Sequence, residues 1–415
     1  MMESSTVFDE ETCYRSRTDF PSLTRTVDGH PVAFLDGPGG TQVPKPVIDA
    51  IVDCYHNRNV NTHGNFAPSS ELDERMLEAR CAVADLLGAA GHEQISIGQN
   101  MTTLAFSLSR AIGRTIRPGD EVLITQLDHE ANRGPWQLLQ ERGAVIREVP
   151  LLPTGELDYA AMKTLITDKT RLLALGCSSN AIGTVNDLKL ARELTRAAGA
   201  LLILDAVHFA PHFPVDVQQI DPDFLLCSAY KFYGPHVGIL YSRPGALSAL
   251  TTDKLVVQDD EAPYRIETGT LNHPAIEGVG AAVDYMARFG RGATRRETVH
   301  DAVAAIAVYE HELGQHLWSS LEGLPSLRLW GVDFSKPMRA PTVSFTIDDV
   351  EASQIAKSLG KIGICVWDGN FYAPRPVGVL SIPGGSLLRV GFSMYNTKDE
   401  AERLVQCVAA LARKK

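Results

Sequence analysis

Between about residues 94 and 243, short apolar runs alternate with longer amphipathic segments. The runs cover residues 95–98, 121–125, 145–151, 171–176, 200–205, 223–228 and 238–242. Most are continuously apolar, which is typical of strands buried on both faces of a sheet. The segments between them, such as 188–200, carry apolar residues at helical spacing and end near glycine. The pattern predicts an α/β fold with a mostly parallel seven-stranded sheet covered by helices.

The last two runs of this region are an exception, because only residues 229–237 separate them. A crossover between parallel strands needs a dozen or more residues. We therefore expect this pair either to be antiparallel or to turn sharply.

Beyond about Gly280 the pattern changes. A long helical stretch (293–323) is followed by alternating runs at 327–332, 341–347, 362–367 and 387–393 and by a final amphipathic helix at about 398–413. This is typical of a smaller α+β domain. We expect an N-terminal segment (1–44) that joins the small domain, a large ligand-binding domain (45–280) and a small C-terminal domain (281–415).

Charge and composition narrow the choice of partners. The 415 residues include 39 Lys and Arg against 50 Asp and Glu, a net charge of −11, which argues against nucleic acid or an anionic membrane surface as partner. No apolar stretch approaches the roughly 20 residues of a membrane span, and residues 1–17 lack the pattern of a secretory signal. Seven scattered cysteines without a C-x-x-C pair argue against a disulfide framework or structural zinc. We expect a reduced, cytoplasmic protein.

Polar side chains follow the predicted strands at their carboxyl ends, where open α/β sheets bind ligands. Asp205 closes the run 200–205, and Lys231 follows the run 223–228 among two tyrosines and a phenylalanine. Burial there lowers the pKa of a lysine amine and makes it a nucleophile toward an aldehyde. Taken alone, Lys231 is better explained as a lysine that reaches solvent, and Asp205 is equally well explained as a helix cap. Together they suit a heteroaromatic cofactor, with the carboxylate on a ring nitrogen and the amine on an aldehyde.

Other strand ends add candidates, each with an ordinary alternative. Thr102 and Thr103 lie at the start of a predicted helix. There the backbone N–H groups and the threonine hydroxyls can bind a phosphate, or the threonines only cap the helix. His129 stacks on a flat ring or is a surface histidine, and Asn180 donates to a phenolate oxygen or shapes its turn. Arg389, on a predicted strand of the small domain, clamps a carboxylate or forms an internal salt bridge.

A metal site is a rival interpretation. The spacing of Asp205, His208 and His212 is similar to that of metal ligands, but Pro211 interrupts a helix between the histidines. No dinucleotide or P-loop glycine motif opens a helix, and the glycine-rich residues 36–40 suit a tight loop that lets the backbone approach a ligand. A metal-dependent hydrolase and a non-catalytic scaffold are the distant alternatives, and we expect no metal.

The order of these motifs resembles the class V aminotransferase family of pyridoxal-phosphate enzymes, specifically its cysteine desulfurase-like branch. The matching motifs are TT, H, SSNAIGT, D-x-x-H, S-x-x-K, ETGTLN and R, within segments from LDGPGGTQVP (35–44) through VNTHGNFAP (60–68) to RVGFSMYNT (389–397). The resemblance implies a fold-type-I enzyme that binds pyridoxal 5′-phosphate, forms a homodimer and acts at the α-carbon of a small L-amino acid.

The resemblance also implies roles for the matching residues. Lys231 binds the cofactor's aldehyde and moves the substrate's α-proton, Asp205 keeps the ring nitrogen protonated, and His129 stacks on the ring as a second catalytic residue. Arg389 clamps the substrate's carboxylate, and Thr270 reaches the phosphate in the neighbouring subunit. The remaining residues are implied near the phenolic oxygen or the phosphate: Asn180 (also near the substrate), His208, Thr102, Thr103, Ser228 and Tyr230.

One position departs from the family pattern. Desulfurases attack the substrate sulfur with a cysteine on a loop of the small domain, whereas here Tyr372 aligns with that position and Cys365 falls earlier, within a predicted strand. We therefore expect Tyr372 to contact substrate and no persulfide to form. Carbon–sulfur cleavage of a cysteine-like substrate is the preferred function. A class V aminotransferase and an isopenicillin-N-epimerase-like epimerase are alternatives, because all begin with loss of the α-proton. Nothing in the sequence supports a sulfur-acceptor protein, although the resemblance allows one.

Overall fold

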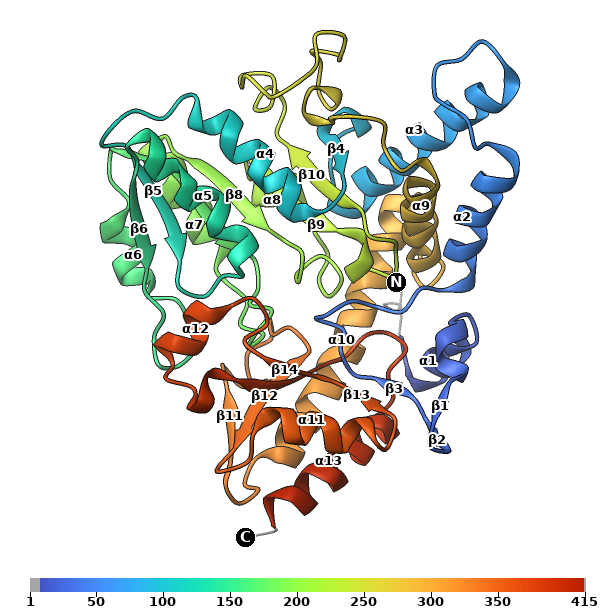
Figure 1. Ribbon diagram of the computed structural model, residues 1–415, viewed down its shortest axis with the longest axis vertical. Coiled ribbons are helices and arrows are strands. Elements are labelled where there is room, and N and C mark those ends of the chain that lie inside the picture. Colours follow the sequence, from blue (N-terminus) through green and yellow to red (C-terminus); the bar gives the residue numbers. More distant parts are fainter. Residues whose placement is uncertain (1–7, 414–415) are drawn as a thin grey trace, which may run out of the picture.

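A seven-stranded sheet forms the centre of the computed structural model, which describes residues 8–413 (Figure 1). Its strand order is β4-β10-β9-β8-β7-β5-β6. The strands are β4 (Ile95–Gly98), β5 (Glu121–Thr125), β6 (Val145–Val149), β7 (Thr170–Gly176), β8 (Leu201–Asp205), β9 (Phe224–Ser228) and β10 (Gly238–Ser242). Strands β5 to β9 are mutually parallel, and β10 is antiparallel to both of its neighbours. The mostly parallel sheet is as predicted, and of the two alternatives left open for the last pair, the structure has the antiparallel one.

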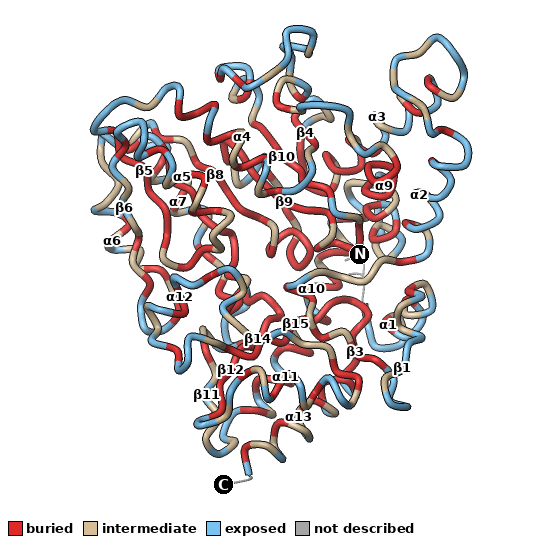
Figure 2. Tube along the Cα trace, viewed as in Figure 1, coloured by how far each residue is buried: buried red, intermediate tan, exposed pale blue. Residues whose placement is uncertain are grey.

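Helices bury both faces of this sheet, which is why its strands are continuously apolar. Successive residues of a strand point to opposite faces, and accordingly Leu202 and Leu204 belong to one apolar cluster and Ile203 to the other. Figure 2 shows the central strands buried along their length. The second cluster is covered by α4 (Met101–Gly113) and α5 (Gly134–Gln137), and the first by α3 (Ala67–Leu87), α6 (Tyr159–Leu165), α7 (Leu188–Ala198) and α9 (His273–Ala287).

A smaller antiparallel sheet follows in the C-terminal part of the chain, in the order β11-β12-β15-β14. Its strands are β11 (Leu327–Trp330), β12 (Thr342–Ile347), β14 (Trp367–Gly369) and β15 (Leu387–Gly391), accompanied by α10 (Arg295–Leu321), α11 (Ala352–Gly360), α12 (Pro374–Val379) and α13 (Lys398–Ala412). The predicted strand at 362–367 is in fact two. Its first half, β13 (Ile364–Cys365), leaves this sheet and pairs with the N-terminal strand β3 (Ala33–Phe34).

The N-terminal segment packs against these C-terminal elements, and the two lie side by side in Figure 1. Besides β3 it contains α1 (Glu10–Arg17), β1 (Thr26–Val27) and β2 (His30–Pro31), before α2 (Lys45–Asn57) begins. The Arg17 guanidinium pairs with Glu400 of α13, and Asp36 pairs with Gly391 at the end of β15. Residues 1–7 of the predicted segment lie outside the described residues.

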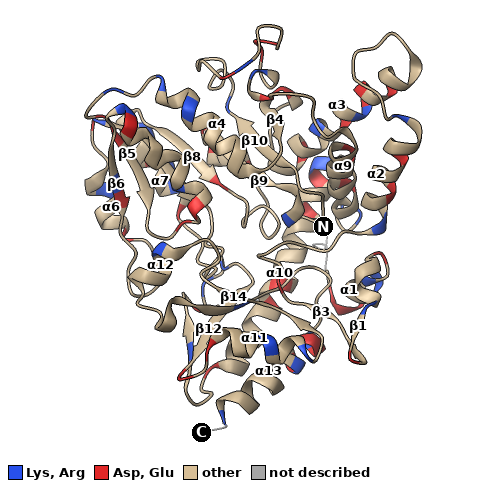
Figure 3. Ribbon diagram, in the orientation of Figure 1, with Lys and Arg blue, Asp and Glu red and all other residues tan. Residues whose placement is uncertain are grey.

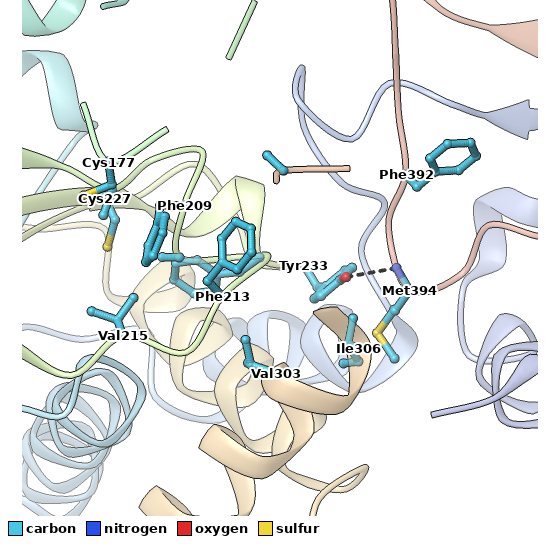
Figure 4. Close-up of a cluster of buried hydrophobic side chains, with 14 of the residues drawn as sticks. Cys177, Phe209, Phe213, Val215, Cys227, Tyr233, Val303, Ile306, Phe392 and Met394 are labelled. Carbon is cyan, nitrogen blue, oxygen red and sulfur yellow. Dashed lines mark hydrogen bonds between the residues drawn. The ribbon is translucent and has the colours of Figure 1, made fainter. Parts of the chain in front are cut away.

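A shared apolar cluster connects the two sheets below the carboxyl ends of the large one (Figure 4). Phe209 and Phe213, which follow β8, pack with Val303 and Ile306 of α10 and with the segment after β15. There the Met394 N–H donates to the Tyr233 hydroxyl at 3.2 Å. This core holds the segment that contains Lys231 against the C-terminal part of the chain.

Charged residues are interspersed over the outer elements (Figure 3), but one buried ion pair braces the large sheet. Arg80 of α3 donates to both oxygens of Glu267 at 2.6 and 2.7 Å, and it also binds the Ile95 carbonyl. Glu267 in turn accepts from the Ile97 N–H. The first residue of the ETGTLN motif thus connects α3, β4 and the turn before α9. Within the described residues, no helix has the length and apolar character needed to cross a membrane.

Glu267→Gln tests this brace. The substitution keeps the shape but leaves the Arg80 charge without its partner, and removing one partner of a buried pair costs about 3–5 kcal/mol. We expect the urea midpoint of the cofactor-free protein to fall accordingly, at fixed protein concentration. Asp49→Asn, which breaks the exposed Lys45–Asp49 pair, is the control and should change stability by less than about 1 kcal/mol. Equal effects would show that the buried pair does not brace the sheet.

Candidate active site

A cavity of about 280 Å³ opens at the carboxyl ends of the large sheet and is roofed by the loop after β14. Four adjacent strands, in the order β9, β8, β7 and β5, contribute the residues that follow them. The lining residues on which the site is built are Lys231, Asp205, Ser178, Asn180, Asp128, His129, Thr102, Ser228, Tyr230, His208, Tyr372 and Arg389. The structure therefore brings together most of the predicted site residues.

Lys231 lies on the floor of the cavity, only 8% exposed, directly after β9. Its Nζ contacts the Pro38 carbonyl of the glycine-rich loop and lies 4.7 Å from the centre of the Tyr230 ring. Burial lowers the pKa of the Lys231 amine to about 7, and the positive charge of Arg389 acts in the same direction. An amine with this pKa is substantially uncharged near neutral pH and is therefore nucleophilic.

Two buried carboxylates follow the neighbouring strands. Asp205 ends β8 and accepts from the Val207 N–H at 2.9 Å, and burial raises its pKa to about 6. Asp128 follows β5 and accepts from the Gly176 N–H and the Asn132 amide. Burial, and then the charge of Asp205, raise the pKa of Asp128 to about 7. A buried carboxylate facing the cavity is stabilised by a protonated ring nitrogen, the partner expected for Asp205.

His129 and Asn180 position the loop above the cavity. The Asn180 amide donates to the Phe371 carbonyl at 2.9 Å, and the Glu130 N–H, next to His129, donates to the Tyr372 carbonyl at 2.8 Å. His129 Nδ1 accepts from the Ala131 N–H at 3.0 Å, so Nδ1 carries no proton. Burial lowers the pKa of His129 to about 4, which leaves a neutral ring suited to stacking.

The N-terminus of α4 faces one end of the cavity, where free helix N–H groups favour an anion. Thr102 and Ser228 line this end, and the Met101 N–H lies 3.3 Å from Ser228 Oγ. The prediction for Thr103 is wrong for this chain: its side chain is exposed and its hydroxyl donates to the Asn100 carbonyl. Asn100 is the helix cap, which turns Thr103 away from the cavity.

Arg389 on β15 reaches the cavity from the smaller sheet and is only 4% exposed. Of the two alternatives considered for it, the structure shows the internal salt bridge. One guanidinium nitrogen donates to Asp36 at 3.1 Å, another to the Asn180 carbonyl at 3.2 Å, and the group lies 4.2 Å from the centre of the Phe371 ring. Arg389 Nε, aligned with none of these partners, has no hydrogen-bond partner.

The three residues of the metal alternative do not form a ligand set. His208 lines the cavity and contacts Thr342 Oγ1 at 3.0 Å, whereas His212 points into the core and pairs with Glu310 at 2.7 Å. Among residues 8–413, no group of three His, Cys, Asp or Glu side chains is arranged to hold a metal ion. Thr270 is also outside the cavity: it is exposed in a surface groove beside Tyr55 of α2.

Buried polar atoms without partners show what the cavity can hold. Four residues that line the cavity carry a buried polar atom with no hydrogen-bond partner in the described chain: Ser178 Oγ, Asn180 Oδ1, His208 Nδ1 and Arg389 Nε. Such atoms are costly unless a ligand satisfies them. With a nucleophilic lysine, a buried carboxylate and a helix N-terminus, the donor set fits a phosphorylated pyridine aldehyde.

Comparison with known proteins agrees with this donor set. The sequence pattern described as Aminotransferase class-V matches residues 33–404. The chain belongs to this family. Its enzymes depend on pyridoxal phosphate, and this protein is accordingly a pyridoxal-phosphate-dependent enzyme.

Similar proteins span nearly the whole chain. Cysteine desulfurases from Serratia proteamaculans and Pectobacterium atrosepticum are 33% and 32% identical over 407 residues, covering 94% of this chain and 96% of each relative. The solved cysteine desulfurase CsdA from Escherichia coli is 27% identical, with a TM-score of 0.84 over 96% of this chain and 98% of that one. An apo cysteine desulfurase from Thermococcus onnurineus, 24% identical with a TM-score of 0.88 over 97% and 98%, shares the fold.

Sequence reasoning missed four residues that line the cavity, Asp128, Ser178, Trp367 and Phe371. It also missed Asp36, which does not line the cavity but accepts a hydrogen bond from Arg389. Asp128 directly follows a predicted strand end, so the rule that found His129 would also have found it. Asp36 had no comparable signal, because its partner Arg389 lies 353 positions away.

The lowered pKa of Lys231 predicts how cofactor binding depends on pH. Only the uncharged amine attacks an aldehyde, so the rate at which the cofactor-free enzyme takes up pyridoxal phosphate should rise with pH and level off above about 7. Stopped-flow absorbance between pH 5.5 and 10 measures this rate. A rise centred near the ordinary lysine pKa, about 10.4, would contradict the burial argument, and Lys231→Ala should show no covalent uptake.

Proposed function

We propose that this enzyme cleaves the carbon–sulfur bond of L-cysteine or a cysteine-like amino acid by β-elimination and releases the sulfur as a free thiol or sulfide. The observation that carries the proposal is one cavity in which a nucleophilic lysine, a buried carboxylate and an arginine converge while an aromatic loop replaces a thiol. The cysteine desulfurase relatives support cysteine as the substrate class.

The residues of the cavity have separate proposed roles in cofactor binding and proton transfer. When bound, the cofactor supplies an electron sink for the charge left on the α-carbon. Lys231, Asp205, His129, Asn180, His208, Thr102, Ser228 and Tyr230 are the proposed cofactor-binding residues. Asp205 would keep the ring nitrogen of the cofactor protonated, and the neutral His129 ring would stack on the cofactor. Lys231 takes the α-proton, and its pKa of about 7 lets it both accept and return a proton near neutral pH.

Arg389 holds the substrate's carboxylate. Its position is set by Asp36 and the Asn180 carbonyl, and the Phe371 ring covers one face of the guanidinium. A fixed carboxylate places the α-carbon next to Lys231, which is the positioning that proton transfer requires.

The sulfur has no thiol acceptor at the site. Tyr372 lines the cavity, and the described lining residues include no cysteine. Cys365 lies in β13, paired with β3, and burial raises its pKa, so it is a poor nucleophile. We therefore assign no persulfide and no sulfur-acceptor protein to this reaction.

We also propose that the enzyme is a homodimer in which Thr270 approaches the phosphate of the neighbouring site. Ile48, Val52 and Tyr55 form one exposed apolar face of α2 at helical spacing, beside the groove that contains Thr270. An exposed apolar face of this kind is typical of an interface. Residues 45–280 would then form the cofactor domain, with 1–44 and 281–415 as the small domain. The free thiols of Cys13, Cys54, Cys81, Cys177 and Cys227 suit a cytoplasmic protein.

Product analysis tests the reaction. With L-cysteine, the loaded enzyme should release pyruvate, ammonium and sulfide in equal amounts without needing an added thiol acceptor. Cys365→Ser should retain the activity, and Lys231→Ala should abolish it. Formation of alanine and a protein persulfide would indicate desulfurase chemistry instead. Transfer of the substrate's amino group to an added keto acid would indicate an aminotransferase, and formation of D-cysteine would indicate an epimerase.

Arg389→Ala tests the carboxylate clamp. Hydrogen bonds to charged groups are worth about 1.5–3 kcal/mol, so the KM for L-cysteine should rise about 10- to 100-fold. Arg328→Ala is the control, because Arg328 is an exposed arginine on strand β11 of the same small sheet, and it should leave KM unchanged. An unchanged KM in Arg389→Ala would place the carboxylate elsewhere.

A further inference from the structure

The rim of the active-site cavity is aromatic, in contrast to its floor. Trp367 is 60% and Tyr372 76% exposed, whereas Lys231 is 8% and Arg389 4% exposed, although all four line the same cavity. Phe371 is half-buried between the exposed rim and the buried floor, and its ring packs against the Arg389 guanidinium. The charged side chains thus lie on the floor of the cavity, and the flat aromatic rings lie at its mouth.

The aromatic rim is held in place before substrate binds. Glu130 N–H and the Asn180 amide donate to the carbonyls of Tyr372 and Phe371, respectively, and the Asn370 carbonyl accepts from the Ala373 N–H. The Tyr372 ring lies 5.7 Å from the His129 ring, at an angle of 37°. A surface positioned in advance binds a ligand at a lower entropic cost than one that must be ordered.

The floor determines which part of a substrate reaches this rim. Arg389 takes the carboxylate and Lys231 faces the α-carbon, so the side chain extends toward Tyr372 and Trp367. The charged residues among the described lining are Asp128, Asp205, Lys231 and Arg389, and all four are buried on the floor. The rim therefore offers no ionic partner to the far end of a side chain.

We propose that the natural substrates are S-substituted cysteines with an aryl or other apolar group on sulfur, and that Tyr372 and Trp367 bind this group. This inference rests on the proposed β-elimination. Lys231 takes the α-proton, the C–H electron pair forms the bond between the α- and β-carbons, and the β-carbon–sulfur pair leaves with sulfur as a thiolate. The three-carbon fragment adds water and yields pyruvate and ammonium. The reaction needs no oxidant or reductant.

Kinetics with paired substrates tests the proposal. For the wild-type enzyme, kcat/KM for S-phenyl-L-cysteine should exceed that for L-cysteine. Stacking contacts of this kind are worth about 0.5–1.5 kcal/mol, so Tyr372→Ala and Trp367→Ala should each lower the ratio of the two values by about 3- to 10-fold. Tyr372→Phe should keep the ratio, because the aromatic face remains. Tyr14→Ala, an exposed tyrosine on α1, is the control.

Binding separates this proposal from the proposed function. Calorimetry on cofactor-loaded, catalytically inactive Lys231→Ala should show tighter binding of S-phenyl-L-cysteine than of S-methyl-L-cysteine. Tyr372→Ala in that background should reduce the difference, because only Trp367 then remains to contact the aryl group. If wild type releases no pyruvate from either substrate, the proposed function fails, and the calorimetric difference still decides whether the rim recognises the aryl group. Equal affinities, or a kcat/KM ratio unaffected by both alanine variants, would overturn the inference.

Discussion

Burial of charged groups at the ends of adjacent strands is the constraint on which the site depends. A parallel sheet covered on both faces leaves its carboxyl edge as the place where polar side chains gather, and here the edge is closed by a second sheet. Lys231, Asp205 and Asp128 therefore titrate in a poorly solvated space, and the same desolvation lowers the pKa of the amine and raises the pKa values of the carboxylates. Desolvation therefore accounts both for the nucleophilic amine of Lys231 and for the raised pKa values of Asp205 and Asp128.

Arg389 shows how the two sheets depend on one another. Its guanidinium comes from the small sheet, its carboxylate partner from the N-terminal segment and its carbonyl partner from the loop after β7. The small sheet, the N-terminal segment and the loop after β7 must all pack together before the Arg389 side chain has its hydrogen-bond partners. The shared core around Tyr233 and Met394 holds the segment of Lys231 in the same assembly. Tertiary packing rather than local sequence therefore brings Arg389 and Lys231 to the same cavity.

An aromatic loop lies at the mouth of the cavity. The family gives the fold and the cofactor, and this loop carries Tyr372, whose carbonyl accepts from the Glu130 N–H after β5. A phenol at the cavity mouth cannot take a sulfur atom from the substrate, whereas it can pack against a group already attached to that sulfur. The proposed function accordingly keeps the cofactor chemistry of the family and releases the sulfur without a protein thiol.

Local pattern was enough to predict the mostly parallel seven-stranded sheet and to place Lys231, Asp205, His129 and Asn180 at strand ends, because buried strands and their ends can be recognised from consecutive residues. For the last strand pair it left an antiparallel pairing and a sharp turn both open. It did not distinguish Thr102 from Thr103, since the cap at Asn100 decides which threonine faces the cavity. Nor did it reveal that Asp36 pairs with Arg389, that the strand near residue 364 splits to pair with β3, or that Phe371 and Trp367 line the mouth. These depend on contacts between residues far apart in the chain, and only tertiary packing brings such groups within bonding distance.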